Sequence, residues 1–156
     1  MLIQGKLLSQ GSNLSEVYFI RRKVFIEEMK LPEAVEYDGQ DDLSIHVIVY
    51  EEAGSKKAVA TGRISFDGEC CEIGYIAVLK EYRNKQYGDF TVRMLLNKAF
   101  TSGIHVVKSM VYSDSVAFFE KIGFHIISDE LMDHNQAYYL MEISAKDIKT
   151  ACHKGI

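Results

Sequence analysis

The stretch "EYRNKQYGDF", residues 81–90, combines the residue types that bind anions. Arg83 and Lys85 supply positive charge, and Gly88 lets the backbone approach a ligand closely. The stretch lies between an apolar run, "IGYIAV", and an amphipathic segment, "TVRMLLNKAF", which predicts the order strand, turn, helix. Because the first amides of a helix have no intrahelical acceptor and lie at the positive end of its dipole, such a turn can hold a phosphate group. The alternative is an ordinary solvated turn, since a short motif with a single glycine is a weak signal.

A second set of charged residues could attract a cationic amine. Residues 31–42, "LPEAVEYDGQDD", contain five carboxylates and no Lys or Arg. An acidic mouth for a cationic substrate would draw on Glu28, Asp38 and Asp41. The alternatives are a solvated loop, as charge runs usually are, or a loop pinned by Arg21 or Arg22.

The cysteines and histidines argue against a metal centre and against a disulfide framework. The histidines are scattered, and no Cys/His group has zinc-ligand spacing, so we expect no metal. Cys70 and Cys71 are adjacent and Cys152 makes the number odd, a pattern that favours reduced thiols in a cytoplasmic protein. We interpret His46, which opens a strand, as a structural histidine rather than a catalytic one.

The overall composition favours a single domain with small-molecule partners. The chain has 156 residues and a net charge of −4, which argues against nucleic acid and favours small or cationic partners. No apolar run approaches the ~20 residues of a membrane helix, so no membrane association is expected. The first ten residues lack a cleavable signal pattern, which indicates a cytoplasmic location. A homodimer stays open at this stage.

The apolar periodicities predict the element order β-α-β-β-β-α-β-α-β-β. Strands on either side of the helix at 89–101 should pair in parallel through a right-handed crossover. The other strands can be antiparallel, which gives a mixed α/β sheet with helices on both faces. The expected strands are residues 2–8, 45–52, 57–67, 71–78, 105–112, 124–128 and 137–144. The expected helices are residues 12–29, 89–101 and 113–124. Residues 145–156 are expected to form a helical turn.

Three segments resemble the GNAT N-acetyltransferases, in the order in which that superfamily carries them. "IAVLKEYRNKQYG" resembles the pyrophosphate-binding segment, where an Ala-Val-like pair leads to Arg/Gln-x-x-Gly-x-Gly/Ala; Arg83, Gln86, Gly88 and Asp89 stand at the motif positions. "IRRKVFIEEMKLPEAVEYDGQDDLSIHVIVY" looks like the amino-terminal half of one bacterial branch. "FFEKIGF" resembles the carboxy-terminal signature Phe-Tyr-Glu-Lys-x-Gly-Phe. The resemblance covers roughly residues 15–143.

The resemblance implies a single acyl-CoA N-acyltransferase domain over residues 1–156. Its mixed, mostly antiparallel sheet would contain a splayed parallel strand pair, with the pantetheine arm of acetyl-CoA in the gap. Backbone groups of Ile76 and Val78 would bond this arm, and the Val78 N–H would hold the oxyanion. The coenzyme site implied by the resemblance consists of Ile76, Ala77, Val78, Arg83, Asn84, Lys85, Gln86, Tyr87, Gly88, Asp89 and Phe119.

The chain departs from the family pattern at three of these positions. Gln86 replaces a glycine, which should weaken binding without abolishing it, and should cost little if its φ is negative. Asp89 brings a negative charge near the diphosphate, which is unfavourable unless Arg83 or Lys85 offsets it or the side chain points to solvent. Phe119 stands where the family's tyrosine often protonates the leaving thiolate.

Two catalytic roles follow from the same resemblance. Glu72 occupies the position at which some family members place a base-acting glutamate, and on an alternating strand it would share a face with Gly74 and Ile76. The alternative is a solvent-facing carboxylate at the end of the strand. Tyr112 is our candidate for the acid in place of Phe119, and Tyr138 and Tyr139 are further candidates. Each of these tyrosines can equally be a part-buried aromatic residue.

The leading interpretation is an N-acetyltransferase that moves an acetyl group from acetyl-CoA to an amine of a small molecule or peptide, by direct attack in a ternary complex. A non-catalytic acyl-CoA-binding or regulatory module of the same fold is the alternative, suggested by Gln86 and Phe119. An acyl-homoserine-lactone synthase is a weaker alternative, since those proteins typically carry Trp and this chain has none.

Overall fold

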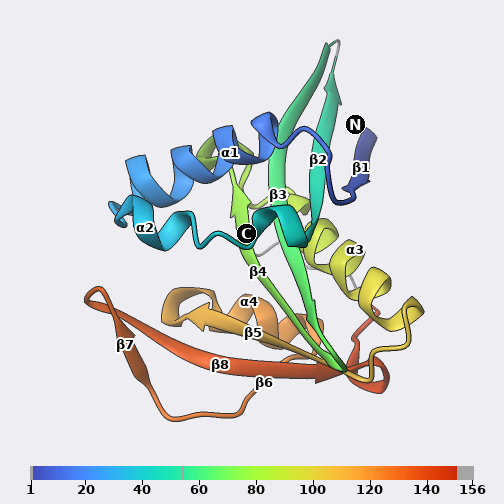
Figure 1. Ribbon diagram of the computed structural model, residues 1–156, viewed down its shortest axis with the longest axis vertical. Coiled ribbons are helices and arrows are strands. Elements are labelled where there is room, and N and C mark those ends of the chain that lie inside the picture. Colours follow the sequence, from blue (N-terminus) through green and yellow to red (C-terminus); the bar gives the residue numbers. More distant parts are fainter. Residues whose placement is uncertain (1, 54, 151–156) are drawn as a thin grey trace.

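The computed structural model describes residues 2–53 and 55–150, which form one open sheet with helices (Figure 1). The eight strands follow the order β1-β2-β3-β4-β5-β8-β6, with β7 paired to β8 off this path. The strands are β1 (Leu2–Leu8), β2 (Ile45–Ala53), β3 (Ser55–Asp67), β4 (Cys70–Val78), β5 (Val106–Tyr112), β6 (His125–Ile126), β7 (Leu131–Asp133) and β8 (Gln136–Ser144). The helices are α1 (Ser15–Arg21), α2 (Glu33–Glu36), α3 (Tyr87–Thr101) and α4 (Val116–Ile122).

β4 and β5 form the parallel pair, and every other pairing in the sheet is antiparallel. Their pairing covers only the stretch from Cys71–Val107 to Ile73–Ser109, after which the strands separate. The Ser109 hydroxyl donates to the Ile73 carbonyl at 2.9 Å, at the point of separation. Figure 1 shows β4 and β5 leaving a common corner and diverging, which confirms the predicted splayed pair.

The two faces of the sheet carry different helices, as the alternating pattern of β2 predicts. Val47 and Val49 belong to the core that contains α3, whereas Ile48 and Tyr50 belong to the core that contains α1. Because successive side chains of a strand point to opposite faces, α1 and α3 cover opposite faces of the sheet. The predicted mixed α/β class with helices on both faces is confirmed.

The first predicted helix differs from the structure in its second half. α1 ends at Arg21, and residues Arg22–Glu28 continue as a π-helix, in which the Met29 N–H donates to the Val24 carbonyl. π-helical turns are rare and often lie near functional sites. The acidic stretch after it is not all loop, since it contains α2 and a short 3₁₀ turn, Asp41–Leu43.

The carboxy-terminal region contains one strand that the sequence did not predict. β7 pairs with β8 through a tight turn at His134 and Asn135, both at positive φ. Local patterning missed this hairpin because β7 has only three residues. Of the predicted terminal helical turn, Ala145–Asp147 is a 3₁₀ turn, and residues 151–156 lie outside the described part.

Candidate active site

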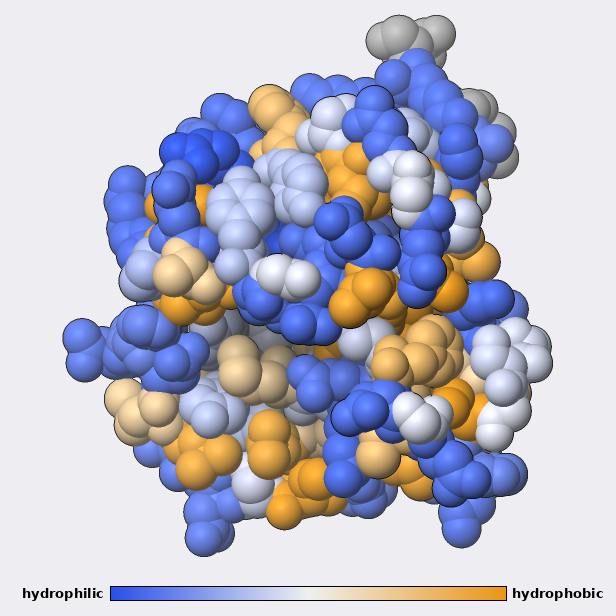
Figure 2. Space-filling view, viewed as in Figure 1, coloured by the Kyte–Doolittle hydropathy of each residue, from blue (hydrophilic) through white to orange (hydrophobic). Residues whose placement is uncertain are grey.

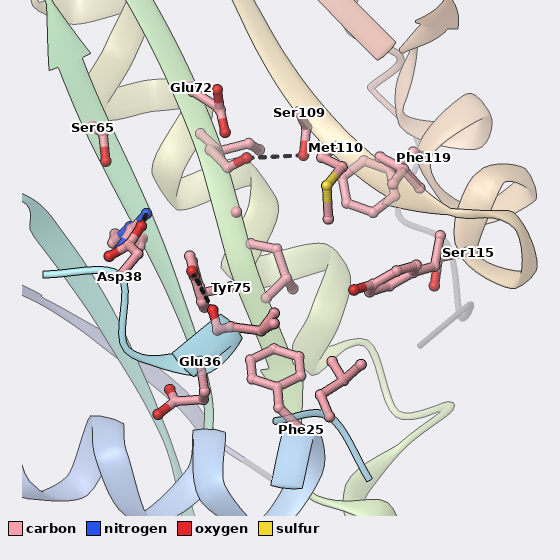
Figure 3. Close-up of a pocket in the computed structure, with 18 residues that line it drawn as sticks. Phe25, Glu36, Asp38, Ser65, Glu72, Tyr75, Ser109, Met110, Ser115 and Phe119 are labelled. Carbon is pink, nitrogen blue, oxygen red and sulfur yellow. Dashed lines mark hydrogen bonds and ion pairs between the residues drawn. The ribbon is translucent and has the colours of Figure 1, made fainter. Parts of the chain in front are cut away.

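A cavity of about 240 Å³ lies where β4 and β5 separate (Figure 3). β4 contributes Glu72, Gly74 and Tyr75 to one wall, and Met110 and Phe119 lie across the space on the other. The side nearest α1 is closed by Phe25 of the π-helix, by Val35 and Glu36 of α2, and by Leu31 and Asp38 from the segments that follow these two helices. Figure 2, seen from the same direction as Figure 1, shows the surface hollowed between the two halves of the molecule.

A bulge in β4 sets which side chains face this cavity. Thr61 pairs with Ala77 and Arg63 with Gly74, so Tyr75 and Ile76 have no partner in the β3 register. Tyr75 has a φ of 52°, a left-handed conformation that is uncommon for a bulky residue. The extra residue changes the alternation at this point of the strand.

The bulge corrects our expectation that Glu72, Gly74 and Ile76 share a face. Glu72 and Gly74 pair regularly with Ser65 and Arg63, and all four line the cavity. After the bulge, the Ile76 side chain turns toward α3, where its Cδ1 lies beside Gly62. Ile76 is still among the residues that line the cavity.

Glu72 lies on the cavity wall with its carboxylate open to solvent. In the described part of the chain it makes no hydrogen bond or ion pair. Its neighbour in the parallel ladder is the exposed Lys108. A carboxylate without a bonded partner remains available to take a proton, which is compatible with the role of base assigned to it above.

The backbone of Val78 points toward the gap. The Leu79 N–H donates to the Val59 carbonyl at 2.9 Å. Because hydrogen-bonded and non-hydrogen-bonded pairs alternate along an antiparallel ladder, the neighbouring pair Ala60–Val78 is not hydrogen-bonded. The Val78 N–H therefore points away from β3, to the side from which β5 has separated. Ala77 by the same alternation bonds to β3, and its buried side chain packs in the core beneath α1.

Of the three tyrosines that we considered as the acid, Tyr112 is the one that lines the cavity. Burial, followed by the charge of Asp133, raises the pKa of Tyr112, which favours the protonated form that an acid needs. Tyr138 and Tyr139 do not line the cavity, and the Tyr139 hydroxyl donates to Glu130 at 3.2 Å. Phe119 lines the cavity but is buried, with its ring centroid 5.1 Å from that of Phe124.

The predicted anion turn has a left-handed backbone. Gln86 precedes the first residue of α3 and has a φ of 76°, and Asn84 has a φ of 61°. The condition under which Gln86 would cost little, a negative φ, is not met, so this glutamine adopts a conformation that favours glycine. The Phe90 N–H donates to the Gln86 carbonyl at 3.0 Å and closes the first helical turn. The amides of Gly88 and Asp89 are therefore first-turn donors without an intrahelical acceptor.

The charges beside this turn are paired differently from the sequence expectation. Asp89 is buried, and its partner is Arg93 at 2.9 Å rather than Arg83 or Lys85. Arg83 instead forms a two-bond ion pair with Glu28, with both N–O distances 2.6 Å, and also donates to the Val78 carbonyl. The hydrogen bonds from Arg83 lower the pKa of Glu28. Glu28 is therefore bound to the predicted anion turn through Arg83, and it does not line the cavity as the acidic-mouth hypothesis required.

The other two acidic-mouth residues are also paired with arginines. Asp38 lines the cavity and accepts two hydrogen bonds from Arg63, both at 2.8 Å. Asp41 is buried between Arg21 and Arg63, at 2.8 Å and 3.1 Å, and does not line the cavity. The loop is thus pinned by arginines, which was the alternative interpretation, although Arg63 takes the place of Arg22.

Sequence reasoning missed Arg63 and Tyr75, which join this charge network to the β4 bulge. The Tyr75 ring lies between two guanidinium groups, 4.3 Å from Arg21 and 4.1 Å from Arg63, and its hydroxyl donates to the Val35 carbonyl. An arginine in the middle of the predicted strand "KAVATGRISF" was the available signal. His46 belongs to the same network through the Asp41 carbonyl, and burial lowers the pKa of His46, which fits a structural role.

The remaining reactive groups do not form a second centre in the described residues. Burial raises the pKa of the Cys71 thiol to about 12, which makes it a poor nucleophile at neutral pH. Across residues 2–53 and 55–150, no group of His, Cys, Asp and Glu side chains is arranged to hold a metal ion. None of the helices in these ranges has the length and apolar character needed to span a membrane.

An open sheet with one splayed parallel pair, a cavity at the split and a helix amino terminus beside it defines the acyl-CoA N-acyltransferase fold. The family model described as "Acetyltransferase (GNAT) family" matches residues 14–124, and the chain belongs to this family. The chain is 32% identical over 139 residues to the uncharacterized protein YyaT of Bacillus subtilis, covering 87% of this chain and 92% of that protein.

Solved structures agree on the fold. An acyl-CoA N-acyltransferase from Pseudomonas aeruginosa superposes with a TM-score of 0.78 at 18% identity, covering 90% of this chain and 99% of that one. The PaiA N-acetyltransferase from Thermoplasma acidophilum, solved in complex with coenzyme A, gives a TM-score of 0.70 at 16% identity over 92% and 99% of the two chains.

Proposed function

We propose that this protein is an acetyl-CoA-dependent N-acetyltransferase that acts on an amine of a small molecule or peptide, by direct attack in a ternary complex. The observation that carries the proposal is the gap between β4 and β5, with the Val78 N–H directed toward it and Glu72 on its wall. A pantetheine arm fits this gap because, on the edge that faces β5, β4 has no strand partner after Ile73. The first-turn amides of Gly88 and Asp89 suit the pyrophosphate.

In the proposed reaction, Glu72 and Tyr112 each transfer a proton. A primary amine has a pKa of ~10.4 and is protonated at neutral pH, so Glu72 takes a proton from it, directly or through water. The amine nitrogen then bonds to the thioester carbonyl carbon, whose oxygen accepts a hydrogen bond from the Val78 N–H. As the C–S bond breaks, the nitrogen releases its second proton to water, which leaves a neutral amide. The thiolate leaves and takes a proton from Tyr112, which regains one from water, or from water itself.

A thiol-release assay with acetyl-CoA and a panel of amines tests this proposal. Replacement of Glu72 by glutamine removes the base, and we expect turnover to fall by roughly 10²–10⁴-fold. Glu69→Gln is the matched control, because Glu69 is an exposed glutamate that precedes β4 and does not line the cavity. Turnover that is unchanged in Glu72→Gln would remove Glu72 as the base.

A non-catalytic acyl-CoA-binding module is the second candidate, favoured by Phe119 at the position of the family's acid. The two candidates differ in one measurement. Tight binding of acetyl-CoA by calorimetry, with no thiol released across the amine panel, would support the binding module and contradict the enzyme.

A further inference from the structure

The cavity also indicates which amines the protein accepts. Taking the proposed acetyl transfer as given, we infer that the acceptor is a small amine with one positive charge and an apolar body, and without a carboxylate. The charges, the apolar surface and the size of the cavity each favour such an acceptor.

The cavity wall offers no free cation to a carboxylate. Arg63 is the one Lys, Arg or His among the described residues that line it. Its terminal nitrogens already donate to Asp38 and Asp41, and its side chain is 10% exposed. A substrate carboxylate would therefore enter a partly buried space without a cationic partner, which is costly. An amino acid or another carboxylated amine does not fit this wall.

The wall has one unpaired carboxylate, which matches one ammonium group. Asp38 is held by Arg63, and Glu36, which also lines the cavity, is paired with Arg21. Figure 3 shows the Glu36 carboxylate directed away from the cavity, toward the first helix. Glu72 is then the lining carboxylate that has no bonded partner. A polyamine would bring a second ammonium for which the cavity has no free carboxylate.

The rest of the wall is apolar and suits a hydrocarbon body. Phe25, Leu31 and Val35 line the side nearest α1, and Met110 and Phe119 line the opposite side. Covering such a surface stabilises a bound apolar group by roughly 25 cal/mol per Å² removed from water. A polar sugar amine would gain little from these side chains.

The size of the cavity favours a compact acceptor, and Gly74 contributes to that size. The volume of about 240 Å³, which the acceptor shares with the thioester end of the donor, lies below the ~300–1,000 Å³ typical of pockets for drug-sized ligands. A Cβ atom built on Gly74 meets no heavy atom within 4 Å, although this residue lines the cavity. The space beside Gly74 is therefore part of the acceptor's volume, and a side chain there would project into it.

A matched panel of amines tests the inference by thiol release from acetyl-CoA. Phenethylamine and phenylalanine share an apolar body and differ in the carboxylate, and spermidine adds further charges. We expect kcat/KM for phenethylamine to exceed that for each of the other two by roughly 100-fold. If phenylalanine or spermidine matches or exceeds phenethylamine, the inference is overturned while the proposed function stands. If acetyl-CoA binds and no amine releases thiol, the proposed function itself is overturned, and the inference with it.

Asp38→Asn tests the charge argument within the same assay. This change removes the negative charge and one of the two oxygens that accept from Arg63, and leaves its guanidinium facing the cavity with less compensation. We expect the kcat/KM ratio of phenethylamine to phenylalanine to fall by about tenfold, a change of about 1.4 kcal/mol in relative barrier. Glu33→Gln is the matched control, because Glu33 pairs with Arg22 on the surface and does not line the cavity. An equal fall in both variants, or in neither, contradicts the role of Asp38.

Gly74→Val tests the size argument. We expect the kcat/KM ratio of phenethylamine to ethylamine to fall by at least about tenfold, because valine fills space that only the larger amine needs. Thermal unfolding and the Kd for acetyl-CoA establish that the variant is folded and binds the donor. A ratio that stays at the wild-type value in a folded variant overturns the assignment of this space to the acceptor.

Discussion

Gln86 lies in the predicted anion turn and has a backbone conformation that is unfavourable for a residue with a side chain. Its φ of 76° is the left-handed conformation that a glycine would adopt freely. The turn thus has the backbone geometry of a glycine-rich phosphate turn although it contains a glutamine. The turn therefore differs from a glycine-rich phosphate turn in the side chain of Gln86 and not in its backbone conformation.

Gln86→Gly should therefore improve coenzyme binding. We expect the Kd for acetyl-CoA, measured by calorimetry, to fall by up to about tenfold, or about 1.4 kcal/mol, because the side chain beside the phosphate site is removed. Lys30→Gly is the control, since Lys30 has a similar φ of 61° but lies at the end of the π-helix, outside the turn. A weaker affinity in Gln86→Gly would indicate that this side chain contributes to binding.

Phe119 stands at the position of the family's tyrosine but has no proton to give, and Tyr112, which also lines the cavity, is our candidate for the acid. We expect Tyr112→Phe to lower kcat by roughly tenfold to 100-fold, at the low end of general acid contributions, because a thiolate is a tolerable leaving group. Adding Phe119→Tyr to this variant should restore part of the loss. The control is Tyr139→Phe, whose hydroxyl bonds to Glu130 away from the cavity. Equal kcat values in Tyr112→Phe and the wild type would exclude Tyr112 as the acid.

At the scale of elements, a buried charge network attaches the loop after α2 to β3 and to the bulge of β4. Arg63 is the central residue, since it contacts Asp38, Asp41 and the ring of Tyr75. The loop, the strand and the bulge form one wall of the cavity. The position of the cavity wall therefore depends on ion pairs of Arg63, whose own side chain is 10% exposed.

Arg63→Met should destabilise the protein strongly, because two carboxylates lose a buried partner. Removing one partner of a buried ion pair typically costs about 3–5 kcal/mol in the free energy of unfolding, measured here by urea denaturation. Arg22→Met breaks the exposed pair with Glu33 and should cost less than about 1 kcal/mol. Adding Asp38→Asn to Arg63→Met should recover part of the loss. Similar losses in the two arginine variants would contradict a special role for the buried network.

At the scale of the whole molecule, the paired carboxylates link folding to pH. The hydrogen bonds from Arg63 lower the pKa of Asp38 from 3.8 to about 2. A carboxyl whose pKa is lower in the folded state stabilises the protein above its unfolded pKa, and this stabilisation is lost as the pH falls. The relevant window for Asp38 is therefore pH 4 to 2.

The difference in unfolding free energy between the wild type and Asp38→Asn should follow this window. We expect a constant difference from pH 7 down to about pH 4.5, followed by a decline toward zero near pH 2. Urea denaturation at a series of pH values measures it. A difference that declines already between pH 7 and 5 would mean that Asp38 is not the group responsible.

The order of elements and the strand–turn–helix arrangement around Arg83 to Gly88 could be predicted from the sequence because both depend on residues close together in the chain. The apolar periodicity of β2, the single turn from Arg83 to Gly88 and the glycine after α4 are local signals. The short β7 strand escaped prediction because its pairing depends on β8 rather than on a pattern of its own.

The sequence by itself determined the family, the fold class and the place of the anion turn, whereas only the tertiary structure decided which charges are free. Arg83 meets Glu28 across 55 positions of the chain, and Arg63 meets Asp38 across 25. The bulge at Tyr75 likewise decided that Gly74, and not Ile76, shares the cavity face with Glu72. Ion pairing and strand register depend on contacts between distant segments, and such contacts exist only once the chain has folded.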